Sequence, residues 1–391
     1  MMAGMNPIRA CVILGLCIIL LPSGYSWGNE SDNGTPASRF KGKNLLVLGD
    51  SITFGGDYVV ELELAFRTRF PLDNTVVWNL GLPSETISGL SEEGHAGGNF
   101  PRPDLAERLD RVMKRLKPDV VFSCYGMNCG IYKPLSSGNL GPYLAGYEKL
   151  ASLCRAMDAE LVISTPPPFD PLPIIGRVTA DGNGGPFSGY DRVLETFSLA
   201  LMQSSLTPLP IADINTNLTD FVTGRRISSP DFTLAGDGVH MNALGHHLAF
   251  ETIADAIGLD TPIDVKLPTA SGTILIDDRT IPIPDGLNMP IQSIEAFNQQ
   301  FNSHKFIGVE NFEVIRVTFD AGKVAHDRTI IDLITKKHQI LKDLWLTETG
   351  HKRPGMRKLE PFDDWNSKAD DLESQIREAI STRPQVQIRF Q

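Results

Sequence analysis

VLGDSITFGG, residues 47–56, leads from a short apolar run through one glycine to an aspartate and a serine, and two further glycines follow after three residues. The run is short enough to be a strand buried on both faces of a parallel sheet, and the serine stands where a helix would begin. A serine in that place commonly caps the helix, but it can also be a nucleophile presented at the end of a strand. The choice depends on what the rest of the chain brings to the same edge of the sheet.

Apolar runs alternate with helical periodicity over the first 260 residues. Leu105, Leu109, Val112 and Leu116 recur at three- and four-residue intervals, as the buried stripe of a helix requires. The alternation predicts a mostly parallel sheet covered by helices on both sides, with its ligand crevice beyond the carboxyl ends of the strands. The expected strands are 45–48, 76–78, 120–122, 161–163 and 211–212, and the expected helices are about 105–116, 142–157, 190–203 and 242–257.

Three of the expected strands end in polar or glycine-rich turns. They are Gly49-Asp50-Ser51, Asn79-Leu80-Gly81 and Tyr125-Gly126-Met127-Asn128. A long Pro/Gly-rich connection, 165–187, follows the fourth strand. A loop of this length in a compact domain is commonly functional or disordered, so it is either a wall or lid of a substrate site or a surface loop without a role.

Composition and charge restrict the partners. The chain has 391 residues, 41% of them hydrophobic and 21% charged, and a net charge of -11. This balance is typical of a globular protein and leaves no broad basic surface for nucleic acid or anionic membranes.

The first residues have the layout of a secretory signal peptide. One arginine precedes an apolar run of about 12 residues, which is too short to span a bilayer, and small residues follow it. We expect a signal peptide over 1–28, cut near Ser26 or Gly28, a polar linker over 29–40, and an exported mature protein without a stable membrane anchor.

Three cysteines remain after the signal segment, and their spacing is neither a disulfide framework nor a metal knuckle. One disulfide among Cys124, Cys129 and Cys154 would leave one free thiol, and the sequence does not select a pair.

Beyond residue 260 the pattern changes to mixed α+β. A hairpin is expected over 273–283, another strand over 312–317, and amphipathic helices over 327–344 and 367–380. The region 261–391 is either a second small domain or an extension packed on the first domain, 41–260.

A nucleophilic serine needs a base that takes its proton and a carboxylate that orients the base. Among eight histidines, only His240 lies beside a carboxylate and a glycine at close spacing, in Asp237-Gly238-Val239-His240. A four-residue turn can bring both side chains together, while Asp213, at the end of the fifth strand, is a weaker rival for the carboxylate. We therefore expect Ser51, His240 and Asp237 to act together.

Such a site also needs donors aimed at the oxyanion that forms on a carbonyl oxygen. Ser51 offers its own backbone N–H at a helix N-terminus, where the helix dipole favours negative charge. Gly81 offers a second backbone N–H, and Asn128 offers a side-chain amide.

In this order the motifs resemble those of the SGNH hydrolases, also called GDSL esterases and lipases. The four blocks correspond to Gly49-Asp50-Ser51-Ile52-Thr53, Asn79-Leu80-Gly81 with Thr86, Gly126-Met127-Asn128, and Asp237-Gly238-Val239-His240 with Asn242 and Gly245. The resemblance spans residues 43–258 and implies a flavodoxin-like three-layer α/β/α sandwich with a central parallel sheet. It implies the same roles for Ser51, His240, Asp237, Gly81 and Asn128, and no cofactor.

The resemblance also bears on substrate. YGMN, TPPPFD and DGVHMNALGH are similar to exported SGNH proteins of environmental bacteria that carry a helical extension and commonly act on acyl groups of carbohydrates. We therefore expect a serine esterase acting on acyl, and foremost acetyl, esters of carbohydrates, with lipid or other carboxyl esters second. One departure is Cys129, where the family usually has an acidic residue, and it predicts a local rearrangement around Asn128.

Two readings from other classes are weaker. A metal site of His240, His246, His247 and Asp237 is disfavoured because adjacent helical residues point about 100° apart. A scaffold that only binds glycan or a surface partner would have no need of every residue with a chemical role. The oligomeric state is open.

Overall fold

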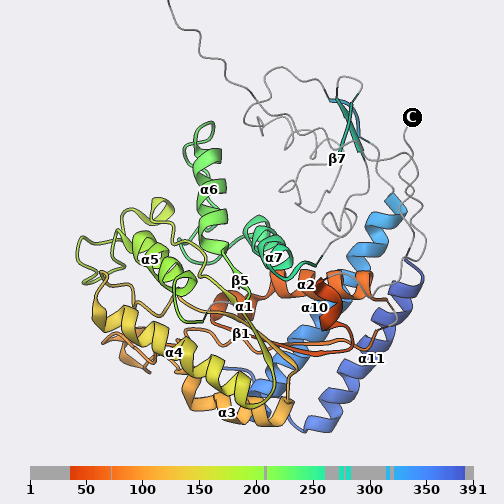
Figure 1. Cartoon of the computed structure of the whole chain (residues 1–391), viewed down its shortest axis with the longest axis horizontal. Helices are drawn as coiled ribbons and strands as arrows, with labels where there is room; N and C mark the ends of the chain where they lie inside the picture. Colours follow the sequence, from red (N-terminus) through yellow and green to blue (C-terminus); the bar gives the residue numbers. More distant parts are fainter. Residues whose placement is uncertain are drawn as a thin grey trace, which may run out of the picture. The chain divides into compact units, whose positions relative to one another are not determined.

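The computed structural model describes residues 36–71, 73–206, 209–259, 273–276, 279–282, 314–317 and 321–383 (Figure 1). The expected signal peptide and the linker residues before 36 lie outside this part of the chain. The described residues belong to one compact unit, Thr35–Gln391. None of their helices is long and apolar enough to cross a membrane.

A five-stranded parallel sheet forms the centre, and all five predicted strands are confirmed. Its order, β2-β1-β3-β4-β5, reverses between β1 and β3, so the carboxyl ends of these two strands flank the topological switch point. Ser51 lies two residues after the end of β1, and Asn128 lies four residues after the end of β3. The strands are β1 Asn44–Gly49, β2 Val76–Asn79, β3 Val120–Cys124, β4 Glu160–Ser164 and β5 Ile211–Ala212.

Helices cover both faces of this sheet, as the resemblance implied. In Figure 1, α2 and α7 lie on one side of the strands and α3 and α4 on the other, as right-handed crossovers from this strand order require. The predicted helices are confirmed with small changes of boundary: α3 Leu105–Leu116, α4 Ser137–Ala156, α5 Tyr190–Met202 and α7 Ala243–Ile257.

Two helices of the sheet unit were not predicted. Helix α2, Asp57–Arg69, is buried almost all round, so it lacks an amphipathic stripe, and its Val59-Val60 pair is typical of a strand. Helix α6, Ile214–Arg226, is largely polar and buries only Ile214, Asn215 and Leu218. Neither pattern shows the apolar period on which the other helix predictions rest.

The short 3-10 turn η1, Pro36–Phe40, buries Ala37 and Phe40 in the core. Residues 36–40 therefore belong to the packed unit rather than to the expected linker.

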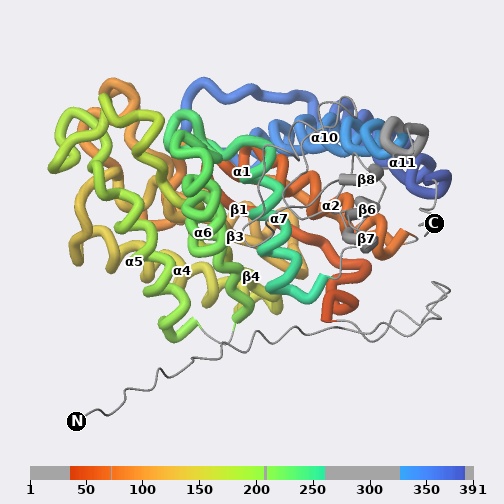
Figure 2. Tube along the Cα trace, turned by 90° about the horizontal axis from the view of Figure 1, so that it is seen from above, coloured from red at the N-terminus to blue at the C-terminus, as the bar shows by residue number. Residues whose placement is uncertain are grey.

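The C-terminal region contains the expected mixture. Strands β6 Thr273–Ile276, β7 Arg279–Pro282 and β8 Val314–Val317 form an antiparallel sheet in the order β7-β6-β8, which confirms the hairpin and the third strand. Helices α10 Ala321–Thr349 and α11 Phe362–Ser381 are longer than predicted and run side by side (Figure 2).

Helix α10 packs on α2 and on β2, the edge strand of the parallel sheet. Ion pairs join the three helices through buried Glu63 and Arg67 of α2, buried Lys337 of α10 and half-buried Glu373 of α11. His338 of α10, whose pKa is lowered by burial, lies 2.7 Å from Glu63. Each charge has an opposite partner, as buried ions require. This set, the α2–α10–α11 charge cluster, connects the two C-terminal helices with α2 of the sheet unit.

Candidate active site

Ser51 is the first residue of α1, Ser51–Gly55, and Asp50 is the cap. The Asp50 carboxylate accepts a hydrogen bond from the Ile52 N–H at 3.0 Å. The strand passes into the helix without an intervening loop because residue 49 is glycine: a Cβ there would lie 1.9 Å from Thr53 Oγ1. Since Asp50 caps the helix, the Ser51 hydroxyl is left for another partner.

That partner is His240. Its Nε2 lies 2.8 Å from Ser51 Oγ, and its Nδ1 lies 2.6 Å from Asp237 Oδ2. A carboxylate only accepts, so Nδ1 carries the proton and Nε2 is the acceptor for the Ser51 hydroxyl. The three predicted side chains thus form one hydrogen-bonded chain across 189 residues of sequence.

The loop that carries Asp237 and His240 is an Asx turn. Asp237 Oδ1 accepts from the N–H groups of Val239 at 2.9 Å and His240 at 2.7 Å. Partial burial alone would raise the pKa of Asp237, but hydrogen bonds from the His240 ring and these two N–H groups outweigh it and lower the pKa. The carboxylate therefore remains charged at neutral pH.

The long loop 165–187 supports this turn. Asp170 donates its N–H to the Gly238 carbonyl at 2.9 Å and receives Nη2 of Arg226 at 2.7 Å. Gly238 has φ of +81°, and a Cβ there would lie 2.6 Å from the Asp170 carbonyl oxygen. The loop therefore lies against the turn that bears the histidine. The rival carboxylate, Asp213, caps α6 and accepts from Thr216 N–H.

Gly81 is the second predicted oxyanion donor. Its N–H donates to Asn79 Oδ1 at 3.0 Å and is already satisfied within its own turn. Gly81 is required for another reason, since a Cβ would come within 2.4 Å of the Phe54 N. Asn128 is buried, and its Nδ2 donates to the Glu85 carbonyl at 3.3 Å, which leaves its second amide hydrogen. The Ser51 N–H, at the helix start, has no acceptor within the helix.

Ser84, in the turn after β2, was not predicted. It has φ of +69°, a conformation that favours glycine, and it is half-buried. Its backbone N–H has no hydrogen-bond partner among the described residues. A serine in a turn does not predict a positive φ from sequence, so this feature of Ser84 is visible only in the structure.

Two side chains hold the far end of α1. Asn79 Nδ2 donates to the Thr53 carbonyl at 2.6 Å, and Lys342 Nζ, from α10, donates to the Phe54 carbonyl at 2.6 Å. The Lys342 ammonium also lies 3.7 Å from the centre of the Phe54 ring. A five-residue helix has few bonds of its own, so these contacts fix its position.

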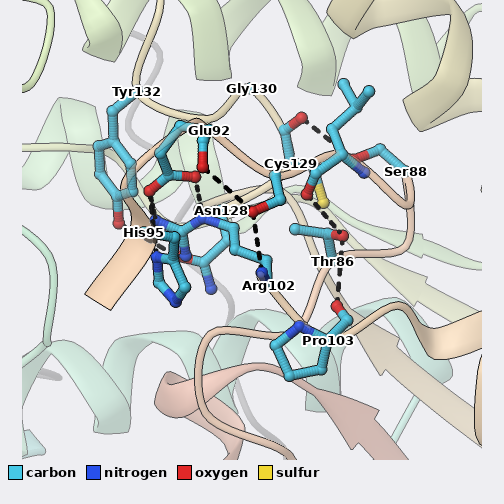
Figure 3. Close-up of polar contacts among 12 residues, drawn as sticks. Thr86, Ser88, Glu92, His95, Arg102, Pro103, Asn128, Cys129, Gly130 and Tyr132 are labelled. Atoms are coloured by element: carbon cyan, nitrogen blue, oxygen red, sulfur yellow. Dashed lines mark hydrogen bonds and ion pairs between the residues drawn. The ribbon is translucent and has the colours of Figure 1, made fainter. Parts of the chain in front are cut away.

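Around Asn128, side chains from the loop 88–102 form a polar cluster that the sequence did not reveal (Figure 3). Arg102 Nη1 donates to Asn128 Oδ1 at 2.8 Å, and Arg102 also binds both oxygens of Glu92 at 2.6 Å. His95 Nδ1 lies 3.2 Å from Glu92.

Cys129 is completely buried, and its carbonyl accepts from Ser88 Oγ at 3.2 Å. The acidic group of this region is therefore Glu92, which reaches Asn128 through Arg102. Cys124, Cys129 and Cys154 are all free thiols, so no disulfide forms among them.

Burial dominates the electrostatics behind Ser51. It raises the pKa of Asp50 to about 6, although the Ile52 N–H and the charges of His240 and Arg102 lower it. His246 stacks on Tyr58, and His247 pairs with Glu61 at 2.6 Å, so neither adjoins Asp237. Within the described ranges no group of three or more His, Cys, Asp or Glu side chains is placed to hold a metal ion.

A flavodoxin-like sheet that presents a serine after its first strand to a His–Asp pair defines a class of acylhydrolases. The chain belongs to the GDSL-like Lipase/Acylhydrolase family, whose model matches residues 47–248, more than half of the chain. It is therefore a carboxylic ester hydrolase, and the resemblance noted in the sequence is confirmed.

Of two similar solved structures, the first shares the fold at low identity. A gut microbial diltiazem-metabolizing enzyme is 14% identical, with a TM-score of 0.56, over 87% of this chain and 95% of its own. An acetylxylan esterase from Geobacillus stearothermophilus is 19% identical, with a TM-score of 0.42, over 56% of this chain and 95% of its own. No curated protein matches the sequence.

Proposed function

We propose that the protein hydrolyses acyl esters through a covalent intermediate on Ser51. His240 Nε2 takes the Ser51 proton as Oγ bonds to the ester carbonyl carbon, and returns it to the departing alcohol when the tetrahedral intermediate collapses. Water then attacks the acyl-serine with His240 as base, which releases the acid and restores Ser51. The single observation that carries the proposal is the hydrogen-bonded chain from Asp237 through His240 to Ser51.

We assign the oxyanion to the Ser51 N–H and the free amide hydrogen of Asn128. The unpartnered Ser84 N–H is our third donor, in place of Gly81, whose N–H is held by Asn79. These donors come from the turns after β1, β3 and β2, so all three lie at the carboxyl edge of the sheet.

We propose short acyl groups, foremost acetyl, on carbohydrate as the substrate. The side chains of His240 and Asp237 are 51% and 48% exposed, so a bulky, polar carrier can reach the serine. Among the described residues, the exposed large apolar side chains all lie outside 49–56, 79–86, 126–130 and 237–242, the segments that carry the proposed site. Little apolar surface is thus offered to a long chain.

Longer acyl esters, including lipid esters, are the second candidate. Leu172 and Ile175 are 39% and 69% exposed, and Ile174 between them packs at Gly238. An apolar rim at this place would favour a longer acyl chain.

The experiment is hydrolysis of p-nitrophenyl acetate by wild type, Ser51→Ala and His240→Ala, with Ser374→Ala on α11 as the matched control. Each triad variant is expected to lose at least about 10³-fold in kcat, while the control keeps full activity. Activity of Ser51→Ala equal to that of wild type would contradict the assignment of Ser51 as the nucleophile. A wild type that is inert on every ester but binds glycan would support the scaffold reading.

The same enzyme is then given acetylated glycans and p-nitrophenyl esters of increasing chain length. Highest kcat/KM on acetyl esters supports the first candidate, and a maximum at long chains the second. We also propose that the protein is exported. To test this, the full chain is expressed and the enzyme is sought outside the cytoplasm. The N-terminal sequence of the enzyme found there tests cleavage near Ser26 or Gly28.

A further inference from the structure

Asn128 is held by donors on one side only. Arg102 Nη1 lies 2.8 Å and the Tyr132 hydroxyl 3.3 Å from Asn128 Oδ1, while Nδ2 faces the Glu85 carbonyl at 3.3 Å (Figure 3). A guanidinium has no acceptor. Burial raises the pKa of Tyr132 above its usual value, so its hydroxyl keeps its proton. The amide oxygen must therefore face Arg102, and the amide hydrogens must face the other way.

Arg102 is itself fixed. Its Nε and Nη2 bind the two oxygens of Glu92 at 2.6 Å each, a bidentate pair, and its side chain is only 7% exposed. The guanidinium carbon lies 5.3 Å from the centre of the Tyr132 ring. With Nε and Nη2 held by Glu92, the guanidinium plane is fixed and Nη1 lies where one of its N–H groups donates to Asn128.

We propose that Arg102 is a positioning residue of the esterase, acting through Asn128. It locks the amide in the orientation that presents Nδ2–H to the oxyanion, and its charge on Oδ1 polarises the amide so that Nδ2–H is a stronger donor. Glu92 holds Arg102 in this geometry. The inference rests on the proposed function, because it requires Asn128 to be an oxyanion donor.

The test is a double-mutant cycle with Arg102→Met and Asn128→Ala, measured as kcat and KM on p-nitrophenyl acetate. Loss of one oxyanion donor costs about 10²- to 10³-fold in kcat. Arg102→Met leaves Asn128 with only its weaker contacts to Tyr132 and Glu85, so we expect a loss of about 10- to 10²-fold in kcat, with KM within about twofold. In the Asn128→Ala background, Arg102→Met should cause no further loss.

Arg111→Met is the matched control. Arg111 also donates to a carbonyl oxygen, that of Thr349, at 2.7 Å, but it lies on α3 and touches none of the residues assigned to the site. It should keep the kcat of wild type. If Arg102→Met alone fails to fold because Glu92 is left unpaired, Arg102→Met/Glu92→Gln removes that charge and takes its place in the cycle.

Three results would overturn the inference. Losses that multiply in the cycle would make Arg102 a general structural residue. A raised KM at constant kcat would make it a substrate ligand. Full activity of Arg102→Met would show that Arg102 has no role in the reaction. If Ser51→Ala is inactive in the same assay, each of these results counts against the role of Arg102 alone, whereas active Ser51→Ala would reject the proposed function itself.

Discussion

Ser84 holds a backbone conformation that serine rarely adopts, in the turn next to the proposed oxyanion. A non-glycine residue with positive φ is strained, at a cost of about 1 kcal/mol, and such strain is often found at functional sites. The strain belongs to the side chain, whereas the proposed donor is the backbone N–H.

Ser84→Gly should therefore relieve the strain and keep the donor. We expect the free energy of unfolding to rise by up to about 1 kcal/mol, because glycine adopts this φ without a clash but loses more entropy on folding. Urea unfolding measures the gain, and kcat on p-nitrophenyl acetate should remain that of wild type. A fall of tenfold or more in kcat would mean that the Ser84 hydroxyl itself contributes.

At this scale the sequence predicts residues that belong to motifs and misses those that do not. Ser51, Asp237 and His240 stand in short patterns whose chemistry is legible, and the structure brings them together. Arg102 and Glu92 lie in a loop without periodicity, and only tertiary contacts reveal them. The sequence did not reveal the hydrogen bond from the Gly81 N–H to Asn79 Oδ1, because it depends on a turn geometry that composition does not specify.

Among the elements, α2 and α7 are joined by a buried ion pair. Burial alone would lower the pKa of His247, on α7, but hydrogen bonds and charges of Glu251 and Glu61 outweigh it and raise the pKa to about 10. A protonated His247 therefore connects α7, which follows the turn 237–240, with α2, which follows α1.

This pair should make stability depend on pH. A histidine whose folded pKa is raised above its usual 6.5 stabilises the fold fully below pH 6.5 and loses that contribution as pH rises toward 10. The difference in free energy of unfolding between wild type and His247→Gln should thus be largest near pH 6.5 and shrink toward pH 10. Urea unfolding at both pH values measures it, and a difference that grows with pH would contradict the pair.

Elements with a strong period were predictable and the others were not. The strands and α3 follow from apolar spacing alone. Helix α2 was not predicted because both of its faces are covered, one by the sheet unit and one by α10. Its local sequence pattern therefore could not be distinguished from that of a strand. Its polar residues Glu63 and Arg67 pair with each other, but their burial also depends on partners more than 270 residues later.

For the molecule as a whole, the α2–α10–α11 charge cluster joins the extension to the hydrolase. Lys337→Met would remove one of the two cations that bind buried Glu63, while Arg67 remains, and the lost charged hydrogen bond typically costs about 2 kcal/mol. Lys336→Met, at the neighbouring exposed position, is the matched control and should change little.

Urea unfolding followed by circular dichroism measures both variants. One transition that moves to lower urea in Lys337→Met, together with loss of esterase activity across the same urea range, is expected if helices and sheet unfold as one unit. Two separate transitions would instead mark the helices as an independent domain.

Lys342 lies late in the chain, so it is translated after the residues of the proposed triad. A nascent chain that has emerged as far as residue 300 already contains Ser51, Asp237 and His240, yet the cation that holds the Phe54 carbonyl is still to be translated. The β2 edge of the sheet is likewise uncovered until α10, which packs on it, has been translated. Chain growth therefore delivers the chemical groups first and their support last, so the finished active site is a late product of synthesis.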